Sequence, residues 1–147
     1  MSPPDKHPLY QVKLVREGRP SYSEAISQPG DAASFFQKRF GKSTQEHFLV
    51  LCLNARNVPL GWREVSRGTL NASLVHPREV FLPAIKLAAG CIILIHNHPS
   101  TDPTPSPEDI QLTRRIAQAG ELLGIEVLDH LVITDTSHIS FKESRLF

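Results

Sequence analysis

The chain has 147 residues, 40% of them hydrophobic, and a formal net charge of +1 at pH 7. This length predicts one domain with a single substantial core. A charge so close to zero gives no electrostatic reason to expect binding to nucleic acid or to an anionic membrane. No apolar run is long enough for a transmembrane helix, and Met1 to Pro8 lack the pattern of a signal peptide, so no membrane partner is predicted.

The two cysteines, Cys52 and Cys91, lie within separate apolar runs and do not form a Cys-x-x-Cys motif. This placement is typical of buried free thiols in a reducing compartment. We therefore predict a cytoplasmic protein without disulfides.

The first half of the chain predicts one helix and up to three strands. A strand over Leu9–Arg16 and a loop over residues 18–30 form an N-terminal segment, residues 1–30, that leads into or belongs to a domain of residues 31–147. Asp31 is expected to cap a helix that ends at Gly41. Apolar runs over Glu46–Asn54 and Leu60–Ser66 are expected to pair as a hairpin, whereas residues 70–75 are ambiguous.

The second half alternates strands with helices. A helix should begin at His76-Pro77 and end by Gly90. The short β-branched run Cys91–Ile95 predicts a buried central strand, and Pro107–Leu123 predicts a third helix. Two further strands are expected within residues 125–135 and 138–141. Together these elements predict an α/β fold with a mixed β-sheet flanked by helices.

The end of the central strand carries two histidines in a metal-binding pattern. Side chains alternate between the faces of a strand, so His96 and His98 should point the same way and Asn97 the opposite way. Pro99 cannot donate to the strand ladder and should end the strand. Two imidazoles at this spacing can reach one ion.

The start of the third helix supplies a third candidate ligand. Ser106 suits the N-cap, Pro107 the first helical position, and Asp109 lies at the spacing of a capping box. The proline-rich loop between the strand and the helix could return Asp109 to the two histidines. Two histidines and a carboxylate with an open position form the ligand set of a catalytic zinc site.

The stretch H-N-H-P-S-T-D-P-T-P-S-P-E-D, residues 96–109, resembles the H-x-H-P, six residues, S-x-x-D signature of the JAMM (MPN+, JAB) metalloprotease-like family. The likeness is closest to its RadC-like branch, because E-V-S-R-G-T, H-P-R-E-V and L-D-H segments are also present. It runs from about residue 31 to the C-terminus. The resemblance implies a curved mixed sheet in the layered architecture of JAB/MPN and cytidine-deaminase-like domains.

The resemblance also implies a role for each candidate residue. His96, His98 and Asp109 correspond to the ligands of one zinc ion, Glu64 to the glutamate that activates water, and Ser106 to the serine that steadies the oxyanion. Zinc chemistry, a nearby carboxylate base and a hydroxyl donor suit these roles. Only the resemblance brings Glu64 to the site.

The resulting prediction is a zinc-dependent hydrolase that cleaves peptide or isopeptide bonds in a peptide or protein substrate. The alternative is a RadC-like accessory module in DNA repair or DNA metabolism, with a structural or weakly active metal. The near-neutral charge counts against it, as do the thirty residues before the first helix, too few for the N-terminal helical region usual in full-length RadC proteins. A third option is a two-histidine, one-carboxylate iron site.

Simpler interpretations remain open for single residues. Glu64 could be a solvated strand residue, and Ser106 could serve only as a helix cap. Asp129 and His130 could support the metal ligands or form a buried polar pair, and the structural interpretation is favoured. The letters H-N-H do not have the extent of an HNH nuclease motif, and the Pro-Cys-x-x-Cys of nucleobase deaminases is absent. The sequence gives no signal for substrate identity or oligomeric state.

Overall fold

The computed structural model describes residues 9, 11, 13, 24–68 and 75–147. Most of the predicted strand at Leu9–Arg16, nearly all of the ambiguous segment 70–75 and most of the predicted N-terminal segment 1–30 lie outside the described residues. Across the described ranges, no helix combines the length and the apolarity needed to cross a bilayer.

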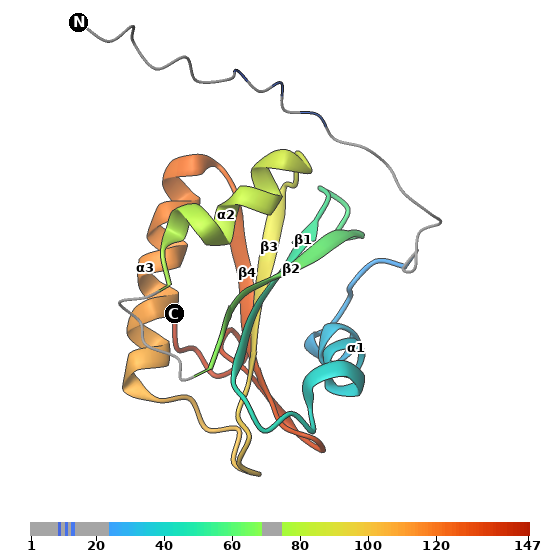
Figure 1. Cartoon of the computed structure of the whole chain (residues 1–147), viewed down its shortest axis with the longest axis vertical. Coiled ribbons are helices and arrows are strands. Elements are labelled where there is room, and N and C mark those ends of the chain that lie inside the picture. The colour runs from blue at the N-terminus through green and yellow to red at the C-terminus, as the bar shows by residue number, and fades with distance from the viewer. Residues whose placement is uncertain (1–8, 10, 12, 14–23, 69–74) are drawn as a thin grey trace, which may run out of the picture.

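A five-stranded sheet forms the centre of the fold, with a helix layer on each face (Figure 1). The strand order is β2-β1-β3-β4-β5; β3 and β4 are parallel and the other neighbours are antiparallel. The predicted mixed α/β sheet is thus confirmed. The elements are α1 Pro29–Phe40, β1 His47–Leu53, β2 Pro59–Arg67, α2 Pro77–Lys86, β3 Cys91–Asn97, α3 Pro107–Leu123, β4 Glu126–Ile133 and β5 His138–Ser140.

The two faces of the sheet bury two separate apolar clusters. Alternation along β1 sends Leu49 and Leu51 towards α1, and Phe48 and Val50 towards α2 and α3. The same alternation along β3 places His96, which pairs with Phe48, on the α2/α3 face. Which face a polar residue occupies therefore decides which helices it can meet.

Helix α1 begins two residues before the predicted cap. Its N-cap is Gln28, and Pro29 and Gly30 are the first helical residues. Asp31 instead lies in the first turn, where its carboxylate accepts hydrogen bonds from the N–H groups of Ser27 and Gln28 at 2.9 and 3.1 Å. A proline needs no hydrogen-bond acceptor at a helix start, which explains the earlier boundary.

Both cysteines are buried free thiols, as predicted. Burial raises the pKa of Cys52 to about 12, so this thiol stays protonated at neutral pH.

Gly120 lies inside α3, where alanine would ordinarily be the better helix former by about 1 kcal/mol. Here an added Cβ would lie 2.3 Å from the carbonyl oxygen of Ile125 and 3.0 Å from Cζ of Phe81. We expect Gly120→Ala to lower the free energy of unfolding by about 1–3 kcal/mol, measured by urea denaturation. The control Gly30→Ala, whose Cβ meets no atom of the described residues closer than 4.0 Å, should change it by less than about 1 kcal/mol. Equal effects of the two substitutions would contradict the packing argument.

Candidate metal centre

The end of β3 and the start of α3 bring three candidate ligands together. His96 is the penultimate residue of β3, His98 follows the strand, and Asp109 lies in the first turn of α3. His96 Nε2 is 2.9 Å from His98 Nε2 and 3.4 Å from Asp109 Oδ1, and His98 Nε2 is 3.4 Å from Asp109 Oδ2. The predicted proximity of these three residues is thus observed.

The spacing of these atoms suits a single metal ion. Ligand atoms about 2 Å from a tetrahedral ion lie roughly 3.3 Å from one another. The observed separations of 2.9–3.4 Å are close to this value, with the two histidines facing different oxygens of the Asp109 carboxylate. The three side chains can therefore hold one metal ion, and three protein ligands leave a fourth position open.

Ser106 and Asp109 form the predicted capping box. Ser106 Oγ accepts the Asp109 N–H at 3.1 Å, and Asp109 Oδ2 accepts the Ser106 N–H at 2.8 Å. The same Asp109 oxygen faces His98. The helix cap thus fixes the orientation of a carboxylate that also belongs to the cluster.

Without a metal, the cluster is a carboxylate between two imidazoles. Burial alone would raise the pKa of Asp109, but His96, His98 and the Ser106 N–H together hold it well below its usual range. The candidate ligand Asp109 therefore carries a negative charge at neutral pH. Its hydrogen bond raises the pKa of His98, with a further contribution from the negative charge of Glu46, so a metal must compete with a proton there.

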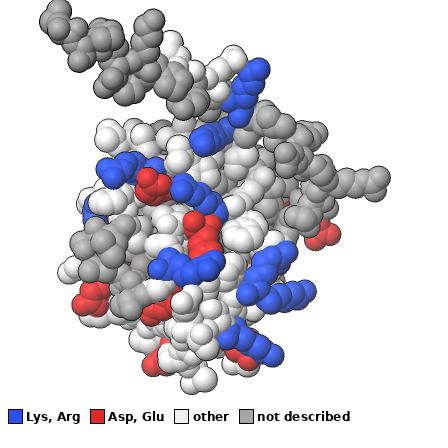
Figure 2. Space-filling model, viewed as in Figure 1, with Lys and Arg blue, Asp and Glu red and all other residues white. Residues whose placement is uncertain are grey.

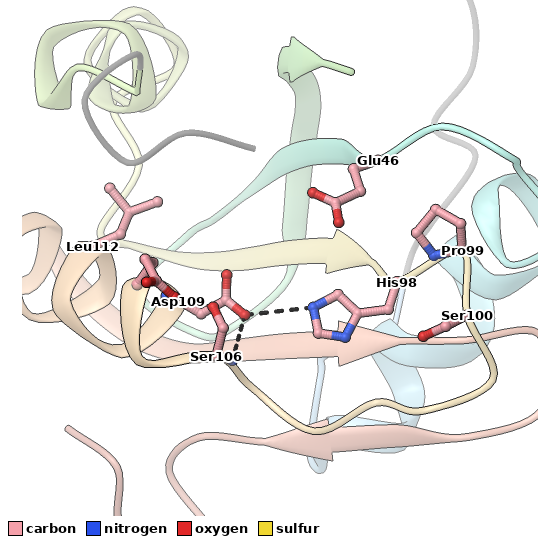
Figure 3. A pocket seen from close by; sticks show the side chains of 8 residues that line it. Glu46, His98, Pro99, Ser100, Ser106, Asp109 and Leu112 are labelled. Atoms are coloured by element: carbon pink, nitrogen blue, oxygen red, sulfur yellow. Dashed lines mark hydrogen bonds and ion pairs between the residues drawn. The ribbon is translucent and has the colours of Figure 1, made fainter. Parts of the chain in front are cut away.

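A pocket of about 440 Å³ opens over His98 and Asp109. Figure 3 shows Glu46, from just before β1, extending over the pocket towards His98 and Asp109. Glu46 was not among the residues singled out from the sequence. It lies two residues before Phe48, which pairs with His96, so strand alternation puts Glu46 on the same face as the ligands. That alternation was the available signal.

Glu64, the predicted base, is not brought to this cluster. It pairs with Leu49, whose side chain belongs to the core on the α1 face, whereas His96 lies on the α2/α3 face. Its carboxylate is bound by Arg67 at 2.7 and 3.0 Å and by His47 Nδ1 at 2.9 Å. The sheet lies between Glu64 and the ligands, which corrects the expectation that Glu64 meets the metal.

The other ring nitrogen of His47 contacts Ser43 Oγ at 2.8 Å. Ser43, His47 and Glu64 thus share the connectivity of a hydrolytic triad, but the Ser43 N–H donates to the Phe40 carbonyl and is not available to an oxyanion. We interpret this network as structural, because its hydrogen bonds connect the α1–β1 turn to β2.

The ion pair of Glu64 with Arg67 makes the stability of the protein depend on pH in the acid range. Hydrogen bonds from Arg67, and secondarily from His47, lower the pKa of Glu64 from 4.5 to about 2, against the effect of burial. A depressed carboxylate pKa contributes stability above pH 4.5, and that contribution is lost as the pH falls towards 2. We expect Glu64→Gln to destabilise the protein most above pH 5 and progressively less towards pH 2, in urea unfolding at several pH values. A difference that does not change with pH would contradict this assignment.

Asn97, between the two histidines, holds the backbone on either side of Glu46. Its Oδ1 accepts the His47 N–H at 2.7 Å and its Nδ2 donates to the Gln45 carbonyl at 2.8 Å. The Asn97 side chain is fully buried and points to the face opposite the ligands, as predicted. The side-chain amide thus makes the two hydrogen bonds that a paired peptide group would make where the pairing of β1 with β3 ends. These bonds hold the backbone of the segment that carries Glu46.

Asn97→Asp should test this role of the Asn97 amide, because a carboxylate accepts the His47 N–H but cannot donate to the Gln45 carbonyl. We expect a loss of about 1–3 kcal/mol in the free energy of unfolding, measured by urea denaturation. Asn54 is the matched control, since its Oδ1 accepts the N–H groups of Arg56 and Val58 at 2.8 and 3.0 Å. Asn54→Asp keeps the oxygen that accepts both N–H groups and should cost clearly less. A larger cost for Asn54→Asp than for Asn97→Asp would contradict the proposed role of the Asn97 amide.

Fold and site together define a class: an α/β domain with a His–His–Asp metal-type cluster where the carboxyl end of β3 meets the N-terminus of α3. Comparison with known proteins then specifies the family. The family model described as the RadC-like JAB domain matches residues 26–146, and the chain belongs to this family.

Curated relatives agree with this assignment. The chain is 47% identical over 122 residues to the UPF0758 protein SH1266 of Staphylococcus haemolyticus, covering 83% of this chain and 54% of that protein. It is 46% identical over 137 residues to a UPF0758 protein of Shouchella clausii, covering 93% and 56%, and 48% identical over 138 residues to one of Geobacillus sp., covering 92% and 61%. The chain thus spans little more than half the length of these relatives, whose names state no activity.

Proposed function

We propose that this domain is a zinc-dependent hydrolase of peptide or isopeptide bonds. The observation that carries the proposal is the pocket in which the carboxylate of Glu46, from just before β1, faces His98 and Asp109 (Figure 3). A metal bound for structural reasons alone needs neither an open position nor a carboxylate above it. His96, His98 and Asp109 would hold the ion.

Each residue of the pocket then has a chemical task. When bound, zinc supplies a Lewis acid that lowers the pKa of a coordinated water to about 7. Glu46 accepts a proton from the attacking water and returns it to the leaving amine. Ser106 Oγ lines the same pocket and accepts the Asp109 N–H, so its own hydroxyl proton remains available to an oxygen that gains charge.

The surface favours a peptide or protein over a nucleic acid as substrate. On the face shown in Figure 2, basic and acidic side chains are interspersed. Nucleic-acid sites gather Lys and Arg over one face. The pocket itself contains Glu46 and Glu108, which would repel phosphates.

The test is hydrolysis by the zinc-loaded chain of a panel of internally quenched peptides and isopeptide-linked lysine substrates. Cleavage should disappear with a chelator and return when zinc is added back. A stoichiometrically loaded protein that cleaves none of the panel, yet binds DNA with a steep salt dependence, would instead support the accessory role in DNA metabolism.

A further inference from the structure

A series of buried hydrogen bonds extends behind His96, away from the pocket. His96 Nδ1 lies 2.8 Å from His130 Nε2, and His130 Nδ1 is within hydrogen-bond distance of Thr113 Oγ1. Thr113 Oγ1 in turn donates to the main-chain carbonyl of Asp109 at 2.7 Å. His130 and Thr113 are fully buried, and His96 and Asp109 are 1% and 4% exposed. This series of hydrogen bonds, here called the relay, therefore begins and ends at two of the three candidate ligands.

The proton positions in the relay follow from its far end, at the Asp109 carbonyl. A carbonyl oxygen can only accept, so the single hydroxyl proton of Thr113 is committed to the Asp109 carbonyl. Thr113 Oγ1 can then offer His130 only a lone pair. His130 must therefore carry a proton on Nδ1 and donate it to Thr113.

The surroundings of His130 determine its second nitrogen. The ring packs against Phe141, with centroids 4.4 Å apart, and against Phe48, with centroids 5.7 Å apart. A charged imidazolium is disfavoured where no water reaches it and two rings pack against it. A neutral His130 with its proton on Nδ1 has a bare Nε2, which must accept a hydrogen bond from His96 Nδ1.

We propose that Thr113 and His130 are positioning residues that hold His96 in the tautomer protonated on Nδ1, so that its bare Nε2 faces His98 and Asp109. The second nitrogen of a metal-binding histidine is commonly fixed by such a partner. Asp109 acts twice, because its carboxylate is a candidate ligand while its carbonyl sets the proton of the relay. This inference rests on the metal site of the proposed function, but not on hydrolysis.

Thr113→Val isolates the relay because it keeps the shape of the side chain and touches no candidate ligand atom. His130 would lose its acceptor at Nδ1, and its other tautomer would donate from Nε2 to His96 Nδ1. The proton of His96 would then lie on Nε2, where the metal must bind. We expect the zinc Kd, measured by competition with a chromophoric chelator, to rise about 10- to 100-fold.

Two further variants control this measurement. Thr113→Ser keeps the hydroxyl and should bind zinc within about threefold of the unmodified chain. Thr134→Val removes a hydroxyl that is equally buried but bonded to Ser137, and should leave the zinc Kd unchanged. A Thr113→Val protein that binds zinc as tightly as the unmodified chain overturns the inference.

A second readout needs neither a variant nor a substrate. Long-range ¹H–¹⁵N spectra should show His130 with its proton on Nδ1 and a bare Nε2, in the metal-free and in the zinc-loaded chain. A proton on His130 Nε2 in either form overturns the inference even if Thr113→Val does not fold. A chain that passes both tests but cleaves no substrate would defeat the proposed hydrolase and leave the relay in place, so the two failures are distinguishable.

Discussion

His96→Ala is expected to abolish stoichiometric zinc binding. Loss of a partner behind a ligand typically costs 10- to 100-fold in affinity, so removal of the ligand itself should cost at least about 100-fold. Zinc at 100 times its Kd should stabilise the unmodified chain by about 2.7 kcal/mol. For a domain of this size that raises Tm by roughly 5–10 °C, and the Tm of His96→Ala should not respond to zinc. Elemental analysis of the dialysed protein and thermal unfolding with and without zinc measure both effects.

His138→Ala provides the matched control for this experiment. His138 is an exposed residue at the start of β5 and does not belong to the cluster. This variant should retain both one zinc per chain and the thermal response to zinc. A His96→Ala protein that still holds one zinc per chain would place the metal elsewhere and remove the basis of the proposed function.

The cluster could be predicted from sequence because its determinants are local. The two-residue alternation of a strand fixes the relation of His96 to His98, and the capping box fixes the relation of Ser106 to Asp109. Only the short loop between them had to be assumed, and its prolines limit its freedom. The structure confirms each local relation.

The face of Glu64 could not be predicted in the same way, because it depends on register between strands. The pairing of β1 with β2 shifts at an irregularity between Phe48 and Leu49, and such a shift changes which residues share a face. Pairing of Glu64 with Leu49 sends it towards α1. Placing Glu46 near the ligands required the pairing of Phe48 with His96, after which alternation backwards from Phe48 gives its face.

Helix α3 shows a second kind of limit. Its last residue, Leu123, is apolar and yet 50% exposed. The buried positions are taken instead by Asp109, Thr113, Ile116 and Gly120, together with Leu112. Polar residues on a buried helix face are costly unless they are hydrogen-bonded. Besides bonds within α3 and its cap, Asp109 meets His96 of β3 and Thr113 meets His130 of β4, and the sequence pattern of one helix does not reveal these partners.

Glu46→Gln is expected to lower the rate of hydrolysis by about 10²- to 10⁴-fold, the usual contribution of a positioned general base. Gln keeps the size of the side chain but cannot take up a proton at neutral pH. Because Glu46 is not one of the three candidate ligands, the variant should still bind one zinc per chain. Initial rates on a substrate cleaved by the unmodified chain, with metal content measured on the same sample, separate these effects.

Glu64→Gln is the decisive comparison, since it makes the same chemical change on the opposite face of the sheet. It should leave the rate at neutral pH within a few-fold of the unmodified chain, while lowering stability through the lost Arg67 ion pair. The opposite pattern, an inactive Glu64→Gln beside an active Glu46→Gln, would return the base to Glu64. It would also require the sheet edge to rearrange on binding metal or substrate, because in this structure the sheet lies between Glu64 and the ligands.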